Sequence, residues 1–281
     1  MTASATVDGR RLVPTSVGLI HVRESTEGTR GPVVLLHQIS SSSRMFLGLM
    51  HEMRLRGWAT LAVDLPGFGH SDPPRGDPSV ELYAEVVATV VERLGYEGPV
   101  PFLGHHTGAR IAATVAAQQP TAVSQLALIG LPLYASETDR SHRWSAKKIR
   151  PIEPESTGRY LLQEWERLRE LSPGSHPALI HREFVDTVSA EAYDQAYAMV
   201  RRHDLHDVVG RITCPTLIIC PEGDPQARNQ EYAAALIRHS HLVRIDGGVF
   251  VVDERAEAVA DLACRFFVAG ATSAVGPPLP S

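Results

Sequence analysis

The sequence predicts an α/β fold in which helices flank a mostly parallel, doubly wound sheet and a helical cap is inserted into the chain. Short apolar runs alternate with amphipathic helical patterns through most of the chain, and this alternation is typical of parallel strands joined by crossover helices. Between about residues 131 and 207 the alternation stops and only helical patterns occur. A length of 281 residues is sufficient for one large domain with such an insertion.

The first part of the chain is expected to form strands and helices in turn. Residues 12–22 predict two short strands around a glycine, and the unbroken apolar runs 33–36 and 58–63 predict strands that are buried on both faces. The serines at 40–43 predict a small-residue loop and an N-cap for a helix that runs to about residue 56. Apolar residues at helical spacing predict an amphipathic helix over 80–94.

The rest of the chain repeats this pattern on both sides of the predicted cap. A strand that ends near residue 103 is followed by a glycine-rich turn and then by a helix over 107–118. The remaining expected elements are a strand at 125–129, a strand at 216–220, a helix at 231–239, a strand at 242–245 and a closing helix at 254–267.

These patterns predict a core of residues 1–131 and 206–270, a helical cap of residues 132–205 and a disordered tail of residues 271–281, which is rich in proline and small residues. One stripe in the cap has helical spacing; it consists of Leu161, Leu162, Trp165, Leu168 and Leu171. We interpret this stripe as cap core rather than as the wall of a substrate pocket.

The chain is organised around an apolar strand, the turn Gly104-His105-His106-Thr107-Gly108 and a helical pattern. This order matches the nucleophile elbow G-x-S-x-G, in which a strained turn lifts one side chain above the sheet. Gly104 and Gly108 are in place, as the close packing of this turn requires. The central position, where serine, cysteine or aspartate normally stands, is His106.

Four further signals accompany the elbow in a fixed order: the run 33–37 before a loop, the turn 64–72, the strand 214–219 running into Gly223-Asp224, and the run 245–250. With these signals the chain resembles the α/β-hydrolase superfamily, near its epoxide hydrolase, haloalkane dehalogenase and C–C hydrolase branch. The resemblance covers about residues 12–268 and implies the α/β-hydrolase fold with a cap.

The chain departs from the family pattern at three site positions. The family's His-Gly oxyanion pair is His37-Gln38, its nucleophile position is His106, and its catalytic histidine position is Val249. Only the acid is intact, as Asp224. The resemblance therefore implies the fold, but not the ordinary Ser-His-Asp reaction.

We hypothesise that the catalytic base has moved to the elbow. Val249, in place of an imidazole, leaves room above Asp224, and the long side chain of His106 points toward that room. Asp224 would then accept a hydrogen bond from His106, directly or through water, and fix its tautomer. The other ring nitrogen would face the pocket as a general base or nucleophile.

The backbone part of an oxyanion hole is expected to survive. Its donors would be the N–H of Thr107 and one N–H from the loop Gln38–Ile39. The side chain of Gln38 either closes the hole or joins it. His37 ends a buried strand beside this loop and is more typical of a residue that braces the loop than of one that reacts.

Metal ligation by His37, His105 and His106 is possible by residue type. An elbow normally turns adjacent side chains in different directions, so we predict neither a metal nor another cofactor. His105, beneath the turn, is expected to serve packing.

Together these residues predict an enzyme that acts on a small, largely apolar substrate in a pocket between core and cap. The expected reaction is a hydrolysis without a serine acyl-enzyme. Two alternatives stay open: lyase, cyclase or isomerase chemistry on the same fold, and an inactive ligand-binding pseudoenzyme. Dependence of turnover on His106 would separate an enzyme from a pseudoenzyme.

Composition limits the partners. The net charge of −5 and the lack of a basic stripe argue against nucleic acid, and no apolar run is long enough to span a membrane. Three scattered cysteines without C-x-x-C spacing, Cys214, Cys220 and Cys264, indicate buried thiols in a reducing compartment. We expect a soluble, cytoplasmic protein, monomeric or homodimeric, whose partner is a small-molecule substrate.

Overall fold

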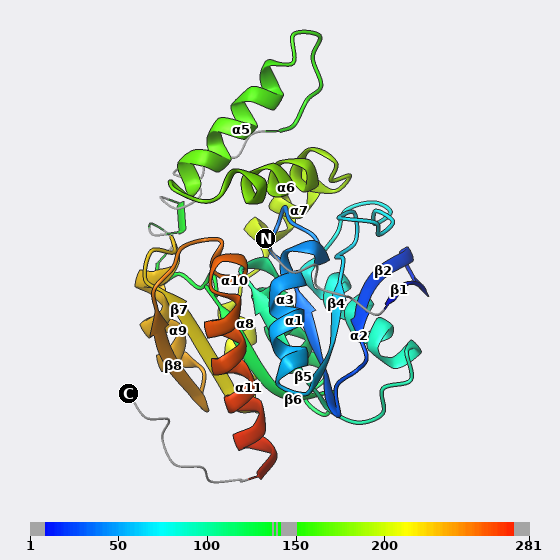
Figure 1. The fold of residues 1–281 in the computed structure, drawn as a ribbon, viewed down its shortest axis with the longest axis vertical. Coiled ribbons are helices and arrows are strands. Elements are labelled where there is room, and N and C mark those ends of the chain that lie inside the picture. Colours follow the sequence, from blue (N-terminus) through cyan, green and yellow to red (C-terminus); the bar gives the residue numbers. More distant parts are fainter. Residues whose placement is uncertain (1–8, 137, 139, 142–150, 273–281) are drawn as a thin grey trace.

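The computed structural model describes residues 9–136, 138, 140–141 and 151–272. Its centre is an eight-stranded sheet in the order β1-β2-β4-β3-β5-β6-β7-β8 (Figure 1). β1 pairs antiparallel with β2 and β2 pairs antiparallel with β4, whereas all other neighbours are parallel. The predicted mostly parallel sheet is therefore confirmed.

The strands are β1 (Gly9–Thr15), β2 (Gly18–Ser25), β3 (Arg30–Leu36), β4 (Trp58–Val63), β5 (Val100–His105), β6 (Val123–Ile129), β7 (Thr216–Pro221) and β8 (Ser240–Ile245). The helices around the sheet are η1 (Ser43–Phe46), α1 (Leu47–Leu55), α2 (Val80–Arg93), α3 (Thr107–Gln118), α8 (His206–Val209), η2 (Ala227–Asn229), α9 (Gln230–Leu236), α10 (Val251–Glu254) and α11 (Ala256–Thr272). The segment expected to form the cap contains α5 (Arg159–Leu171), α6 (Pro177–Val188) and α7 (Tyr193–Arg202).

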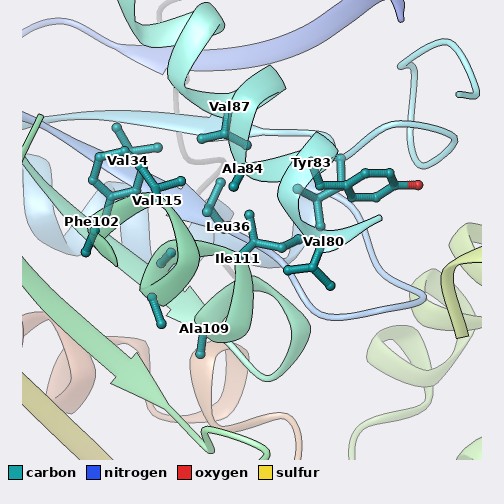
Figure 2. Close-up of a cluster of buried hydrophobic side chains, with 14 of the residues drawn as sticks. Val34, Leu36, Val80, Tyr83, Ala84, Val87, Phe102, Ala109, Ile111 and Val115 are labelled. Carbon is teal, nitrogen blue, oxygen red and sulfur yellow. The ribbon is translucent and has the colours of Figure 1, made fainter. Parts of the chain in front are cut away.

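Helices cover both faces of the sheet, which explains why the central strands are apolar without alternation. In β3, Val33 and Leu35 pack into a cluster with α1, α10 and α11, whereas Val34 and Leu36 pack on the opposite face with α2 and α3. Figure 2 shows this second cluster, in which Phe102 of β5 joins side chains of both helices. The three cysteines are buried and unpaired.

The expected serine loop and N-cap are present: Ser40–Ser42 form a buried loop whose hydroxyls bond to α6, and Ser42 Oγ accepts from the Arg44 amide where the helical turns begin. Two other helices differ from the sequence expectation at their ends. The helix expected over 231–239 ends at Leu236. The closing helix is interrupted at Arg255, and α11 continues through Thr272 into the expected tail. Residues 273–281 of that tail lie outside the described residues.

Helices α5, α6 and α7, in the segment expected to form the cap, lie on one side of the sheet domain, with α5 outermost in Figure 1. In the predicted apolar stripe, Leu168 is buried beside Ile180 of α6, and Trp165 packs edge-on against Phe184 with ring centroids 5.7 Å apart. Leu162, by contrast, is 60% exposed. Three of the stripe residues thus pack within this segment and against the core loop that carries Val249. Leu168 and Leu171 also line a cavity, so the interpretation of the stripe as core rather than pocket wall was wrong for these two residues.

Backbone and side-chain hydrogen bonds hold this segment to the core. The Gly67 carbonyl accepts from the amides of Glu191 and Ala192 at the start of α7. Arg110 of α3 donates to the carbonyls of Pro132 and His203, at distances of 3.0 Å and 3.1 Å. Arg110 therefore holds both ends of the segment. No helix among the described residues is long and apolar enough to cross a membrane.

Candidate active site

The elbow has the strained backbone that its motif predicts. His106 joins β5 to α3 with φ 47° and ψ −105°, a left-handed conformation that residues other than glycine rarely adopt. Its amide donates to the Ile129 carbonyl and its carbonyl accepts from the Arg110 amide. A Cβ at Gly108 would lie 1.9 Å from the Leu36 carbonyl oxygen, so only glycine lets α3 start this close to β3.

His106 and Asp224 are in direct contact. Asp224 follows β7, and its Oδ2 lies 2.7 Å from His106 Nε2. Its Oδ1 accepts from the Gln226 amide at 2.6 Å. Gly130, at the end of β6, lies between the strands that carry the pair; a Cβ there would lie 2.5 Å from His106 Cδ2. The missing side chain at this position makes room for the contact.

The charge of the pair follows from its surroundings. Burial alone would raise the pKa of Asp224, but the neighbouring His106 ring, its hydrogen bond and the Gln226 amide hold this pKa below its ordinary value. An ionised carboxylate only accepts hydrogen bonds, so His106 Nε2 is the donor to Asp224, and Nδ1 is the ring nitrogen left for acid–base chemistry. Among the described residues, Nδ1 has no hydrogen-bond partner.

The contact lies beside a cavity of about 60 Å³ between the core loops and the cap. Its lining is mixed rather than mainly apolar; the lining residues are Gln38, Ile39, Ser40, His106, Arg167, Leu168, Leu171, Glu183, Thr187, Tyr197, Pro225, Gln226, Val249 and Phe250. A smaller cavity of about 20 Å³ adjoins it and is also lined by Ile39 and His106, together with Thr107 and Arg110.

The structure brings most of the predicted oxyanion residues to these cavities. Gln38, Ile39 and Val249 line the larger one, and Thr107 lines the smaller one. Within the described chain, the Thr107 amide, at the first position of α3, donates to no backbone carbonyl. The Gln38 side chain is buried at the cavity wall without a side-chain hydrogen bond to a described residue.

His37 is placed differently from the other four. It is fully buried, lines neither cavity and uses both ring nitrogens: Nδ1 donates to the Gln38 carbonyl at 2.8 Å, and Nε2 accepts from the Leu65 amide at 2.9 Å. Burial lowers its pKa, against the opposing effect of Asp64. The ring is thus neutral and braces the loop that carries Gln38 and Ile39.

His105 does not turn away from His106, and the expectation that the elbow separates adjacent side chains was wrong for this pair. Their ring centroids lie 4.3 Å apart with the planes tilted by 35°. His105 is fully buried, and both of its ring nitrogens are without a partner among the described residues. Burial, and then the neighbouring His106, hold its pKa well below the ordinary value, so the ring is neutral.

Ligand atoms of His105, His106 and Asp224 lie within 4.8 Å of one another, and these three residues are the cluster that could hold a metal in the described part of the chain. The donor types suit a transition metal. Nε2 of His106, however, is already in hydrogen-bond contact with Asp224 Oδ2, at 2.7 Å. The geometry fits a hydrogen-bonded pair better than a metal site.

Sequence reasoning missed the residues that the cap contributes, above all Glu183, Arg167 and Tyr197. One signal pointed to Glu183. It lies three residues after the apolar Ile180 and so shares a helix face with it, and a charged residue on a buried face often has a specific partner.

A family model described as "alpha/beta hydrolase fold" matches residues 31–256. The chain therefore belongs to the α/β-hydrolase fold family. It is similar to 2-(acetamidomethylene)succinate hydrolase of Mesorhizobium japonicum, with 31% identity over 154 residues. This match covers 51% of the chain and 54% of the relative, so the chain spans about half the length of that protein.

Solved structures share the fold over nearly the whole chain. A thermophilic esterase from Thermogutta terrifontis with malate bound has a TM-score of 0.76 at 24% identity, over 94% of this chain and 100% of the esterase. The enol-lactonase from Burkholderia xenovorans LB400 has a TM-score of 0.70 at 18% identity, over 89% of this chain and 97% of the lactonase. At these identities the likeness shows the fold alone.

Proposed function

We propose that this protein is a hydrolase that acts on a small molecule between core and cap, with His106 as a general base oriented by Asp224. One observation carries the proposal. The imidazole of His106, at the central position of the elbow, contacts the carboxylate of Asp224, at the family's acid position, with 2.7 Å between Nε2 and Oδ2. Membership of a hydrolase-rich fold family and a relative named as a hydrolase support the reaction type.

In the proposed reaction, His106 Nδ1 takes a proton from a water molecule, and the water oxygen attacks the carbonyl carbon of the substrate. The Thr107 amide, an amide of the Gln38–Ile39 loop and the Gln38 side chain would stabilise the negative oxygen that develops. Because neither serine nor cysteine stands at the elbow's centre, the reaction passes through no serine acyl-enzyme. These steps require no cofactor.

The substrate would have an apolar part and a polar reacting group. One wall of the cavity is apolar and consists of Leu168, Leu171, Val249 and Phe250. The carbonyl group of the substrate would react near His106 and the side-chain amide of Gln38, which also line the cavity. The cavity volume is about 60 Å³, well below the roughly 300–1,000 Å³ of typical ligand pockets. We infer that the cap shifts outward to admit substrate.

The test is hydrolysis of a panel of small esters, lactones and amides by the purified protein and its His106→Gln variant. We expect kcat to fall by about 10²–10⁴ in the variant, as for loss of a general base. Unchanged turnover in His106→Gln would refute the proposed base. Saturable binding of panel compounds without turnover by the wild-type protein would favour the pseudoenzyme, and rearranged products would favour a lyase, cyclase or isomerase.

A further inference from the structure

Helix α6 of the cap places a buried carboxyl group on the wall of the cavity that also contains His106. Glu183 is 3% exposed. Its Oε1 accepts from Ser41 Oγ at 2.9 Å and from Arg182 Nη2 at 2.6 Å. Its Oε2 accepts no hydrogen bond from a described residue, yet neighbouring atoms do not seal it off. One oxygen is therefore anchored, and the other is unpaired on a side chain that lines the cavity.

The groups around Glu183 contain more carboxyls than guanidinium groups. Arg182 donates to both oxygens of Asp253, at 2.5 Å and 2.8 Å, as well as to Glu183. Arg44 donates to Asp186 at 3.0 Å. The buried Glu183 and Asp186 and the partly buried Asp253 thus share two guanidinium groups, and full ionisation would leave one uncompensated negative charge.

More distant charges do not remove this excess. Arg167 on α5 is paired with Glu164 through two hydrogen bonds. Arg23 and Asp64, which both bond to Ser43 next to the serine loop 40–42, add one charge of each sign. Glu254 on α10 adds a further acid near Asp253. Because an unpaired buried charge is costly, the cluster is expected to retain a proton.

Resting on the function proposed above, we propose that Glu183 is the general acid of the reaction: it carries a proton on Oε2 and delivers it to the leaving group from the cap side. His106 then acts from the core side of the same cavity. Oε2 is the one oxygen of the anchored Glu183 carboxyl that is free to reach a bound substrate.

The electrostatics agree with this role. Burial raises the pKa of Glu183; Arg182 opposes the shift, whereas Asp253 and Asp186 reinforce it, and the net result is a pKa above the ordinary value. The same logic holds for Asp253, whose pKa burial also raises. Of these two acids, only Glu183 lines the cavity with His106.

The proton balance closes. The water oxygen bonds to the carbonyl carbon while one water proton moves to His106 Nδ1. The bond from carbon to the leaving oxygen or nitrogen then breaks, its electron pair stays on that atom, and the Glu183 proton binds there. Transfer of the proton from His106 to Glu183 through cavity water restores both groups, and one water is consumed. Substrates with poor leaving groups, such as alkyl esters, lactones and amides, need such an acid most.

The first test needs no substrate. Infrared difference spectra at pH 7 should show the C=O stretch of a buried carboxylic acid in the wild-type protein. The band should be lost in Glu183→Gln and kept in Ser41→Ala, which removes one hydrogen bond to Oε1 but leaves the carboxyl group. Absence of the band in the wild type, or its persistence in Glu183→Gln, would overturn the proposal.

The second test compares alkyl and aryl acetates as probes. Glu183→Gln should lower kcat for alkyl acetates by about 10² or more and change kcat for aryl acetates much less, since phenolates leave without protonation. An equal loss for both series, or the same loss in Ser41→Ala, would show a positioning role instead. Glu183→Asp, which keeps a transferable proton, should retain the alkyl-to-aryl ratio of the wild type.

These outcomes are separable from failure of the proposed function. If His106→Gln loses activity on both series and Glu183→Gln keeps the wild-type ratio, the base stands and the acid is refuted. If His106→Gln retains activity, the proposed function itself fails.

Discussion

The two walls of the cavity both carry buried ionisable groups, but they are built in different ways. On the core wall, His106 and Asp224 stand at the ends of β5 and β7, with β6 and Gly130 between them, so sheet geometry sets their separation. On the cap wall, a helix carries Glu183, and side chains from the serine loop, α6 and α10 hold it. The positions of the ionisable groups on the core wall thus depend on the backbone of the sheet. The position of Glu183 on the cap wall depends on hydrogen bonds and ion pairs between side chains.

The direction of the pKa shifts separates the walls as well. Although burial opposes it, the pKa of Asp224 is lowered because His106 favours the charged form. The pKa values of Glu183 and Asp253 are both raised. Burial is the main cause, and the single Arg182 that bonds to both carboxyls does not offset it. The shift thus favours the ionised carboxylate on the core wall and the protonated acid on the cap wall, which is the difference that an acid–base pair requires.

The largest expected effect comes from breaking the core wall. Asp224→Asn removes the charge that fixes the His106 tautomer, and Gly130→Ala forces a Cβ against the His106 ring. Each should lower kcat by about 10²–10⁴ while the fold is kept. Steady-state kinetics on the hydrolysed panel compound, with circular dichroism for the fold, measures this.

The matched control is Asp246→Asn, the same substitution at an exposed aspartate that pairs with Arg255. It should leave kcat unchanged. Wild-type kcat in Asp224→Asn would show that the core pair is only structural.

The next effect concerns the charge network of the cap wall. Arg182→Met leaves Asp253 and Glu183 without their shared cation, and breaking a buried pair on one side typically costs about 3–5 kcal/mol. Arg265→Met, at an exposed pair with Asp261, should cost no more than about 1 kcal/mol. Urea unfolding of both variants gives the comparison; equal losses would contradict a charge-dependent cap wall.

A smaller effect should appear in the pH dependence of stability, with opposite signs for the two walls. The lowered pKa of Asp224 contributes stability that is present above its unfolded value of about 3.9 and is lost as the pH falls. The raised pKa of Glu183 contributes stability that is present below its unfolded value of about 4.3 and is lost as the pH rises.

Unfolding free energies from acid to neutral pH therefore distinguish the variants. The destabilisation by Asp224→Asn should be greatest at neutral pH and should shrink toward acid. The destabilisation by Glu183→Gln should be greatest in acid and should shrink as the pH rises. Parallel profiles for the two variants would mean that the walls do not differ in charge state.

Metal removal and serine-directed reagents are expected to have no effect on the protein. Dialysis against a chelator should leave activity unchanged, because His106 Nε2 is in hydrogen-bond contact with Asp224 rather than free to bind a metal. Fluorophosphonate should not label residues 104–108, where neither serine nor cysteine occurs. Stoichiometric zinc binding that is lost in His105→Asn, or mapped labelling of the elbow, would require a different chemistry on the core wall.

Sequence motifs were sufficient for the core wall because its determinants are local. An apolar strand, two glycines and a helix start define the elbow around His106, and the end of a strand defines Asp224. The parallel sheet brings such strand ends to one edge, so the contact between them could be anticipated. The same local reasoning wrongly separated His105 from His106, because the direction of a buried ring depends on the packing around it.

The sequence by itself determined the fold class, the order of the strands and helices along the chain, and the unusual histidine at the centre of the elbow. Only the tertiary structure decided that Glu183 shares a cavity with His106 and that it competes with Asp253 for Arg182. Glu183 and Arg182 are adjacent on α6, whereas Asp253 is on α10 and His106 is at the elbow before α3. Amphipathic patterns show which face of a helix is buried, but not which charges meet there, since that depends on how the cap packs onto the core.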